Sequence, residues 1–164
     1  MMASGALVAL PAWANQWNTA SLTLTPAEVF TMLEQNLLAS VADTIIPAGN
    51  SIGALSVGVD QFLIKLLDQC YEKEIQENVK HQLDHLNQTA MSAFAKGFSE
   101  CDQVQRQKLL MELASSEDKS KTEFFNLMKS ETIRGFSTSR EVMVTYLKYK
   151  QVPGHFFGCV DVKV

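Results

Sequence analysis

The sequence has no excess of basic residues and no long apolar run. Its 14 lysines and arginines are outnumbered by 18 aspartates and glutamates, which gives a net charge of -4. Binding to nucleic acid depends on a clustered basic surface, and the lysines and arginines here are scattered along the chain. No apolar run reaches the roughly 18 residues that a membrane-spanning helix needs. These absences argue against nucleic-acid binding and against a membrane span of the chain's own.

Cysteine is scarce as well. The chain has Cys70, Cys101 and Cys159, and no two of them have C-x-x-C spacing. In an exported protein, an odd number fits one disulfide with a leftover thiol, or three free thiols. Burial of all three as small apolar side chains is an equally good interpretation. The sequence leaves the pairing open.

The motifs that usually mark a catalytic or cofactor site are missing. There is no G-x-G-x-x-G, no P-loop and no G-x-S-x-G, and the glycine-containing stretch 53–58 lacks the P-loop spacing and its Lys-Ser/Thr pair. No pair of titrating residues stands out as a general acid and base. The sequence therefore predicts no catalytic residue, and no flavin or nicotinamide bound by this chain alone.

One pair of histidines offers a weak candidate for a metal site. His81 and His85 are four residues apart, so on a helix they share a face and can chelate a metal ion. The pair does not form H-E-x-x-H, because Gln82 stands where the glutamate would be, and no third ligand is evident. A solvated pair on a polar helix is the simpler interpretation. A stand-alone metal- or small-ligand-binding module is the alternative function that this pair supports.

The N-terminal 27 residues carry no charge. Residues 3–13 read ASGALVALPAW, and residues 12–14 fit the A-x-A pattern that precedes signal-peptidase cleavage. Residues 1–14 are therefore predicted to be the remnant of an export signal without its usual basic beginning, and residues 15–164 the mature, periplasmic domain. A flexible apolar arm is the alternative interpretation of the first segment.

Apolar residues recur at helical spacing through most of the chain. Thr25-Pro26 with Glu28 forms a capping box, which predicts a helix that runs through Ile45 and stops before Pro47. A loop over residues 48–58 precedes a second helix from Val59. Residues 72–82 are polar and indicate an exposed continuation or a break.

Further helices are predicted toward the C-terminus. The next one ends with Gly97 as its C-cap, another begins at residues 99–102, and a short apolar helix surrounds residues 124–128. A capping box of Thr138 and Glu141 opens the last helix. No segment alternates with period two, so no sheet is expected. The predicted fold is all-α, a single domain of five to seven helices with an irregular C-terminal tail.

Glycine, proline and aromatic residues gather in residues 131–160. Gly135-Phe136 and the stretch GHFFGC at 154–159 both suggest aromatic-rich turns. These aromatic side chains either close the core of this chain or extend over another protein, where aromatic residues often dominate the binding energy. The pattern alone supports the two interpretations about equally.

Three stretches together resemble a known family. They are residues 41–62 (VADTIIPAGNSIGALSVGVDQF), 124–139 (FFNLMKSETIRGFSTS) and 149–160 (YKQVPGHFFGCV). In this order they are similar to motifs of the gluconate 2-dehydrogenase subunit 3 family, the small subunits of exported flavin-dependent sugar and sugar-acid dehydrogenases. Residues 48–54 (AGNSIGA) lack the proline of the family's loop, and no arginine pair of a twin-arginine signal is present.

The resemblance implies an accessory, non-catalytic subunit. In this family FAD and the substrate site belong to a large subunit of the glucose-methanol-choline type, and a cytochrome c subunit often accepts the electrons. The small subunit is thought to assist folding of the large one and to carry it through the twin-arginine route. A docking tail then becomes the preferred interpretation of the C-terminus, with Cys159 a candidate for cross-linking to the partner. The predicted interface residues are Phe136, Tyr149, Pro153, Gly154, Phe156, Phe157 and Cys159.

Overall fold

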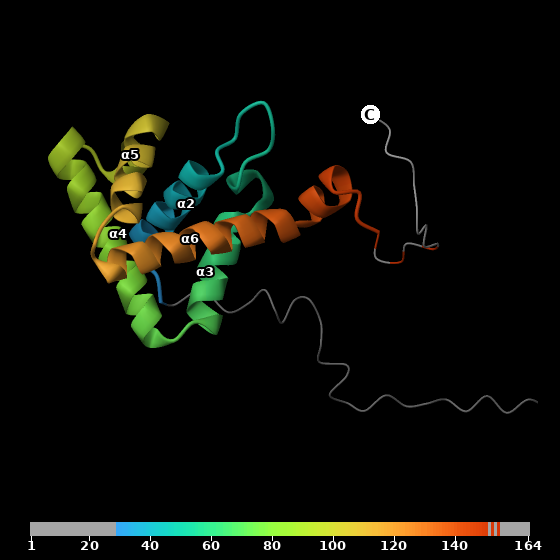
Figure 1. The fold of residues 1–164 in the computed structure, drawn as a ribbon, viewed down its shortest axis with the longest axis horizontal. Coiled ribbons are helices and arrows are strands. Elements are labelled where there is room, and N and C mark those ends of the chain that lie inside the picture. Colours follow the sequence, from blue (N-terminus) through green and yellow to red (C-terminus); the bar gives the residue numbers. More distant parts are fainter. Residues whose placement is uncertain (1–28, 151, 153, 155–164) are drawn as a thin grey trace, which may run out of the picture.

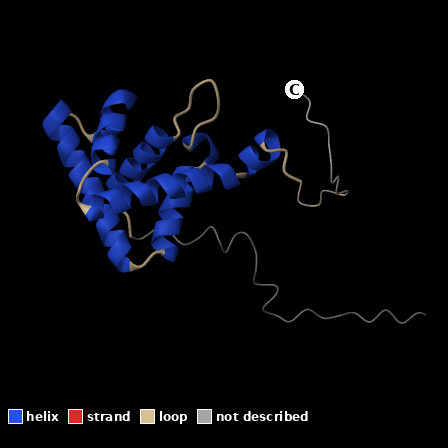
Figure 2. Ribbon diagram, viewed as in Figure 1, coloured by secondary structure: helices blue, strands red, loops and turns tan. Residues whose placement is uncertain are grey.

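The computed structural model describes residues 29–150, 152 and 154. Throughout this part the chain forms helices and turns and no strand (Figure 2). The elements, with their bounds, are α2 (Met32–Ile45), the 3-10 turn η2 (Leu55–Val57), α3 (Val59–Cys70), α4 (Lys73–Phe94), the 3-10 turn η3 (Phe98–Glu100), α5 (Gln103–Ala114), α6 (Lys119–Thr138) and the short π-helix η4 (Val142–Tyr146). The all-α fold and its number of helices are confirmed.

Helix α2 begins six residues later than its predicted capping box. The side chain of Thr31 accepts a hydrogen bond from the amide of Glu34, and the carboxylate of Glu34 accepts one from the amide of Thr31 at 2.6 Å. Val29 and Phe30 form a bend before this cap, so no continuous helix runs from residue 25 to Ile45. Phe30 is buried at the bend and anchors the chain there. The predicted end, before Pro47, is confirmed.

The polar stretch 72–82 belongs to a new helix that follows a sharp break. Tyr71 and Glu72 have extended backbones, and α4 then continues unbroken for 22 residues. The amide group of Gln76 holds the break together, because it donates hydrogen bonds to the carbonyls of Leu67 at 2.8 Å and Tyr71 at 2.9 Å. Gln76 is itself buried, so its two N–H groups are satisfied without water.

The predicted C-cap of α4 at Gly97 is wrong. Ala95 takes the left-handed conformation there, with φ of 54°, while Gly97 has an ordinary φ of -62° and precedes η3. The side chain of Asn87 explains the placement, because its oxygen accepts a hydrogen bond from the amide of Phe98 at 3.0 Å. This bond turns the chain so that Phe98 is fully buried. The cap that begins α5, Asp102 with Gln105, is found where the sequence predicts an N-terminus.

Helix α6 is longer than predicted and contains no turn at Gly135-Phe136. It runs for 20 residues, with Gly135 buried inside it. A Cβ atom at this position would lie 2.6 Å from Cδ1 of Phe62, so the glycine permits the close approach of α3. Ser139, rather than Thr138, then breaks the helix, and its hydroxyl accepts a weak hydrogen bond from the amide of Val142.

Helix α2 lies at the centre of the bundle and contacts each of the helices α3 to α6 (Figure 1). Its buried face includes Leu37, Leu38 and Val41, which pack in the main core. A smaller core joins Ala42 of α2 to Val59 and Leu63 of α3. Other members of the main core are Ile64, Leu67, Val79, Leu83, Leu86, Phe98, Leu109, Leu110, Leu113, Phe124 and Met128.

Candidate functional site

The chain beyond α6 forms a compact turn outside the bundle (Figure 1). The amide of Leu147 donates to the carbonyl of Val142 at 3.0 Å, and the amide of Tyr149 donates to that of Met143 at 2.9 Å. Lys148, with φ of 54°, supplies the left-handed residue that such a helix ending requires. The backbone from residue 140 to residue 149 therefore has a defined shape.

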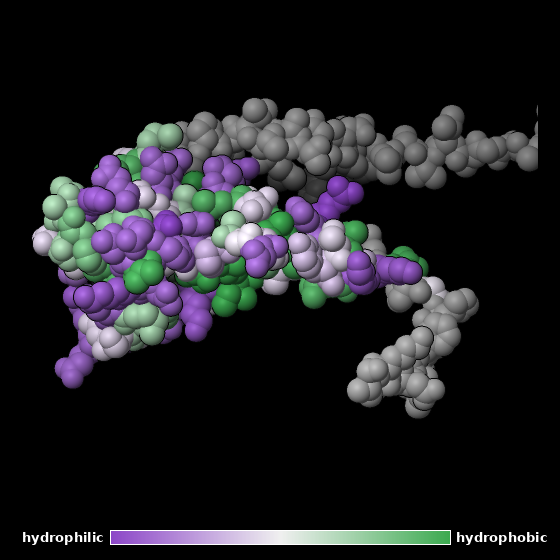
Figure 3. Space-filling view, turned by 90° about the horizontal axis from the view of Figure 1, so that it is seen from above, coloured by the Kyte–Doolittle hydropathy of each residue, from purple (hydrophilic) through white to green (hydrophobic). Residues whose placement is uncertain are grey.

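This turn and the residues after it expose apolar side chains. We call the five of them the C-terminal apolar segment; their exposed fractions are 55% for Val144, 52% for Tyr146, 60% for Leu147, 54% for Tyr149 and 82% for Val152. Isolated exposed apolar residues are normal, and elsewhere the visible face of the bundle is largely hydrophilic with small hydrophobic patches (Figure 3). Five within nine residues form a concentration of the kind that marks an interaction site.

The predicted interface residues differ in burial, and some of them lie outside the described residues. Phe136 is half-buried on α6 and packs against the smaller core, so its ring serves this chain. Tyr149 is exposed, and so is Gly154, which has a positive φ of 80°. Pro153, Phe156, Phe157 and Cys159 lie outside the described residues, as does the predicted export segment 1–14.

Four residues of the C-terminal apolar segment are absent from the predicted interface: Val144, Tyr146, Leu147 and Val152. The first three follow Val142 in the last predicted helix, and an apolar stripe on a helix usually faces a core. The only local sign of exposure is that Val142 to Leu147 fall on more than one face of a helix, with Val142 alone buried. Whether such a stripe meets a core depends on whether other helices reach it.

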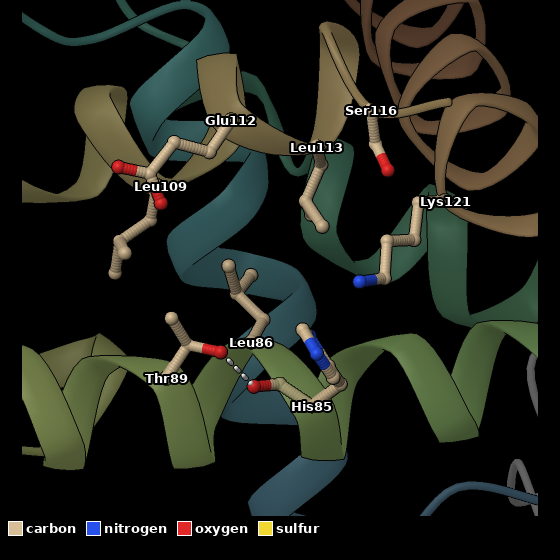
Figure 4. A pocket seen from close by; sticks show the side chains of 8 residues that line it. All are labelled: His85, Leu86, Thr89, Leu109, Glu112, Leu113, Ser116 and Lys121. Carbon is tan, nitrogen blue, oxygen red and sulfur yellow. Dashed lines mark hydrogen bonds between the residues drawn. The ribbon is translucent and has the colours of Figure 1, made fainter. Parts of the chain in front are cut away.

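The two histidines of α4 have different surroundings. His81 is exposed, whereas the ring of His85 stands in a cavity of about 110 Å³ between α4, α5 and the first turn of α6 (Figure 4). Burial lowers the pKa of His85, and the positive charges of Lys121 and His81 add to this effect, with Asp118 opposing them. Among the described residues, no group of three or more His, Cys, Asp or Glu side chains is arranged to hold a metal ion.

Two of the cysteines lie in the described part. Cys70 is exposed at the end of α3, Cys101 is buried beside the cap of α5, and the two are not joined. Burial, and secondarily the charge of Asp102, raises the pKa of the Cys101 thiol. A thiol with a raised pKa is a poor nucleophile, so Cys101 has the properties of a core side chain.

None of the helices in the described residues is long and apolar enough to cross a membrane.

Comparison with known proteins identifies the family. The search of curated proteins and that of solved structures returned no significant match. The model of the family described as Gluconate 2-dehydrogenase subunit 3 matches residues 32–154, which include helices α2 to α6 of the described residues and the C-terminal apolar segment. The chain belongs to the gluconate 2-dehydrogenase subunit 3 family.

Proposed function

We propose that this chain is a non-catalytic accessory subunit of a periplasmic, FAD-dependent sugar or sugar-acid dehydrogenase. It binds the large catalytic subunit and supports that subunit's folding, stability and export. FAD and the substrate site reside in the large subunit, of the glucose-methanol-choline type, and a cytochrome c subunit accepts the electrons. The family supports a place in a dehydrogenase complex, and the C-terminal apolar segment is the observation that carries the docking role.

The backbone of this segment favours its use as a docking element. The two hydrogen bonds that close the turn at Leu147 and Tyr149 give a defined shape to the backbone that carries Val144, Tyr146, Leu147 and Tyr149. A preorganised surface loses less conformational entropy on binding, so more of the contact energy appears as affinity. Tyrosine adds large contact area together with a hydroxyl group, which suits it to the centre of an interface.

The charges around the segment are consistent with a docking role. Lys148 and Lys150 flank Tyr149, and Arg140 and Glu141 precede the π-helix; all four side chains are exposed. Charges in these positions would surround the apolar contact as a polar rim, where they influence the rate and specificity of association more than its strength.

A binding measurement with matched variants tests the proposal. Tyr146→Ser combined with Leu147→Ser removes two exposed apolar side chains from the segment. Val104→Ser combined with Met111→Ser removes two other exposed apolar side chains, 76% and 57% exposed, from α5. We expect the first variant to bind the co-expressed flavoprotein subunit at least about 30-fold more weakly, which corresponds to about 2 kcal/mol. The α5 variant should bind within about twofold of the unchanged chain.

Stability and activity measurements complete the test. Because the four side chains are exposed, both double variants should unfold within about 0.5 kcal/mol of the unchanged chain per substitution. Equal partner binding by the two variants would place the interface elsewhere. Phe156→Ala and Phe157→Ala test the rest of the predicted tail in the same assay. Dye-linked dehydrogenase activity of the purified chain with added FAD would overturn the non-catalytic assignment.

A further inference from the structure

The cavity beside His85 is lined by two kinds of side chain. Leu86 of α4 and Leu109 and Leu113 of α5 form an apolar wall, while polar groups converge from all three helices and their connection. The polar lining consists of His85, Thr89, Glu112, Ser116 and Lys121. A volume of about 110 Å³ is several times what one water molecule requires, so the space can hold a molecule of a few heavy atoms.

His85 has an unmet hydrogen-bonding requirement in this cavity. Its Nδ1 atom is shielded from solvent and has no hydrogen-bond partner among the described residues. A buried polar atom without a partner costs about 1–3 kcal/mol, so nearly all such atoms in folded proteins have a partner or a bound water. Thr89 cannot donate to it, because its hydroxyl already donates to the backbone carbonyl of His85 at 2.8 Å. Because water does not reach Nδ1 in the present orientation of the ring, a molecule in the cavity satisfies this atom once the ring turns toward it.

The positive charge of Lys121 is also uncompensated. This half-buried side chain takes part in none of the ion pairs found in the described residues. Its amine points toward the ring of His85, whereas the carboxylate of Glu112 lies at the other side of the cavity, near Leu109 and Thr89 (Figure 4). Lys121 therefore places a cation beside the ring of His85, on which the negative charge of Asp118 also acts, and the leucines provide an apolar surface next to it.

We propose that this cavity binds a small carboxylate, with its oxygens at Lys121 and His85 and its aliphatic part against the leucine wall. The two chemical features that select this class are a cation next to an orphan imidazole nitrogen and an apolar wall within the same small volume. An inorganic oxyanion would satisfy the cation but not the apolar wall. A neutral molecule would leave the charge of Lys121 without a partner. The inference does not depend on the docking role of the C-terminal segment.

Binding should depend on pH, because a bound anion stabilises the protonated form of His85. Without a ligand, burial and the charges of Lys121 and His81 lower the pKa of His85 below its usual 6.5. Two negative groups also face this region, Asp118 at the start of α6 and Glu112 on α5, and both are present with or without the ligand. A carboxylate between Lys121 and His85 therefore raises the pKa of His85, and it binds more tightly as the pH falls toward 6.

Titration of the full chain with acetate, followed by NMR of the histidine rings, tests this proposal. His85→Gln identifies the signal of His85, and the exposed His81 on the same helix is the internal control. We expect a saturable shift of the His85 signal, with a dissociation constant of about 1–10 mM for so small a ligand. The pKa of His85 should rise with acetate, and Lys121→Met should weaken binding about tenfold or more.

Three controls use the same readout. Sodium chloride at equal ionic strength and acetamide, the neutral analogue of acetate, should produce no saturable shift of His85. Inorganic phosphate should bind more weakly than acetate because it cannot use the leucine wall. No saturable response to acetate would mean that the cavity holds water only, and an equal response to acetamide would mean that the charge of Lys121 does not select the ligand. Equal affinity for phosphate, or acetate binding unchanged by Lys121→Met, would also overturn the proposal.

Discussion

Single residues on α6 decide how closely it approaches α3. Gly135 leaves room for the ring of Phe62, and the guanidinium of Arg134 lies 5.7 Å from the centre of the same ring. Arg134 also pairs with the buried carboxylate of Glu131 at 2.7 Å. A glycine inside a helix is unfavourable by roughly 0.5–1 kcal/mol relative to alanine. Its presence here has a packing reason rather than a conformational one.

Replacement of Gly135 by alanine tests this packing argument. We expect Gly135→Ala to lower the free energy of unfolding by about 1–2 kcal/mol, because the new methyl group overlaps the Phe62 ring and the helices must shift. In a Phe62→Ala background the overlap is gone, so the same change should instead stabilise the chain by about 0.5–1 kcal/mol. Urea unfolding of the four proteins measures both effects. The same sign in both backgrounds would contradict the argument.

Caps and connections define the elements more sharply than apolar periodicity does. The boxes at Thr31 and Asp102 begin α2 and α5, and in each the side chain of the third helical residue accepts a hydrogen bond from the backbone amide of the cap residue. Beyond α6, the π-helix and the left-handed Lys148 form a turn in which Val142 is the one buried residue. The elements are thus closed by local hydrogen bonds even where few residues are buried.

The cap of α2 can be tested with two substitutions at one position. Thr31→Ala should reduce the free energy of unfolding by about 1 kcal/mol, because the amide of Glu34 loses its acceptor and the largely buried carboxylate of Glu34 loses the Thr31 hydroxyl. Thr31→Ser keeps the hydroxyl, so the free energy of unfolding should change by only a few tenths of that amount. Thermal or urea unfolding distinguishes them. Equal loss in both variants would show that the hydroxyl does not cap the helix.

At the scale of the whole molecule, a few polar links join distant parts of the chain. Arg106 of α5 pairs with Asp43 of α2 at 2.8 Å, and both side chains are largely buried. Tyr71, between α3 and α4, donates a hydrogen bond to Glu131 of α6 at 3.1 Å. Burial first, and then this hydrogen bond and the charge of Glu131, raises the pKa of Tyr71 above 10.0. These links orient helices that apolar contacts alone would hold less specifically.

The raised pKa of Tyr71 predicts how stability changes with alkaline pH. Protonated Tyr71 contributes fully to the free energy of unfolding below pH 10.0, the pKa of tyrosine in the unfolded chain. This contribution is lost as the pH rises above 10.0, because the unfolded chain releases the phenolic proton before the folded chain does. Tyr71→Phe should lower the free energy of unfolding by about 1 kcal/mol at pH 8. The difference in the free energy of unfolding between the unchanged chain and Tyr71→Phe should shrink from pH 9 to pH 11. A difference that stays constant or grows over this range would contradict the assignment.

The sequence alone determines the helical class, several helix ends and the family likeness. Pro47 ends α2 because the residue before proline is excluded from the helical region, and Asp102 caps α5 because its short carboxylate reaches the backbone amide of Gln105. These are interactions between residues a few positions apart. The ordered motifs that suggest the family are likewise read along the chain, and the family match over residues 32–154 bears them out.

Only the tertiary structure decides which patterns meet a core and which meet solvent. Helical spacing of apolar residues is found in both places, but Phe124 and Met128 are buried while Val144 and Leu147 are exposed, because α6 extends out of the bundle before the last turn begins (Figure 1). Gly135 continues a helix instead of ending one because Phe62, 73 positions earlier, fills the space beside it. The cavity at His85 likewise needs Lys121 from another helix. Burial depends on contacts between residues far apart in the chain, and local patterns do not encode such contacts.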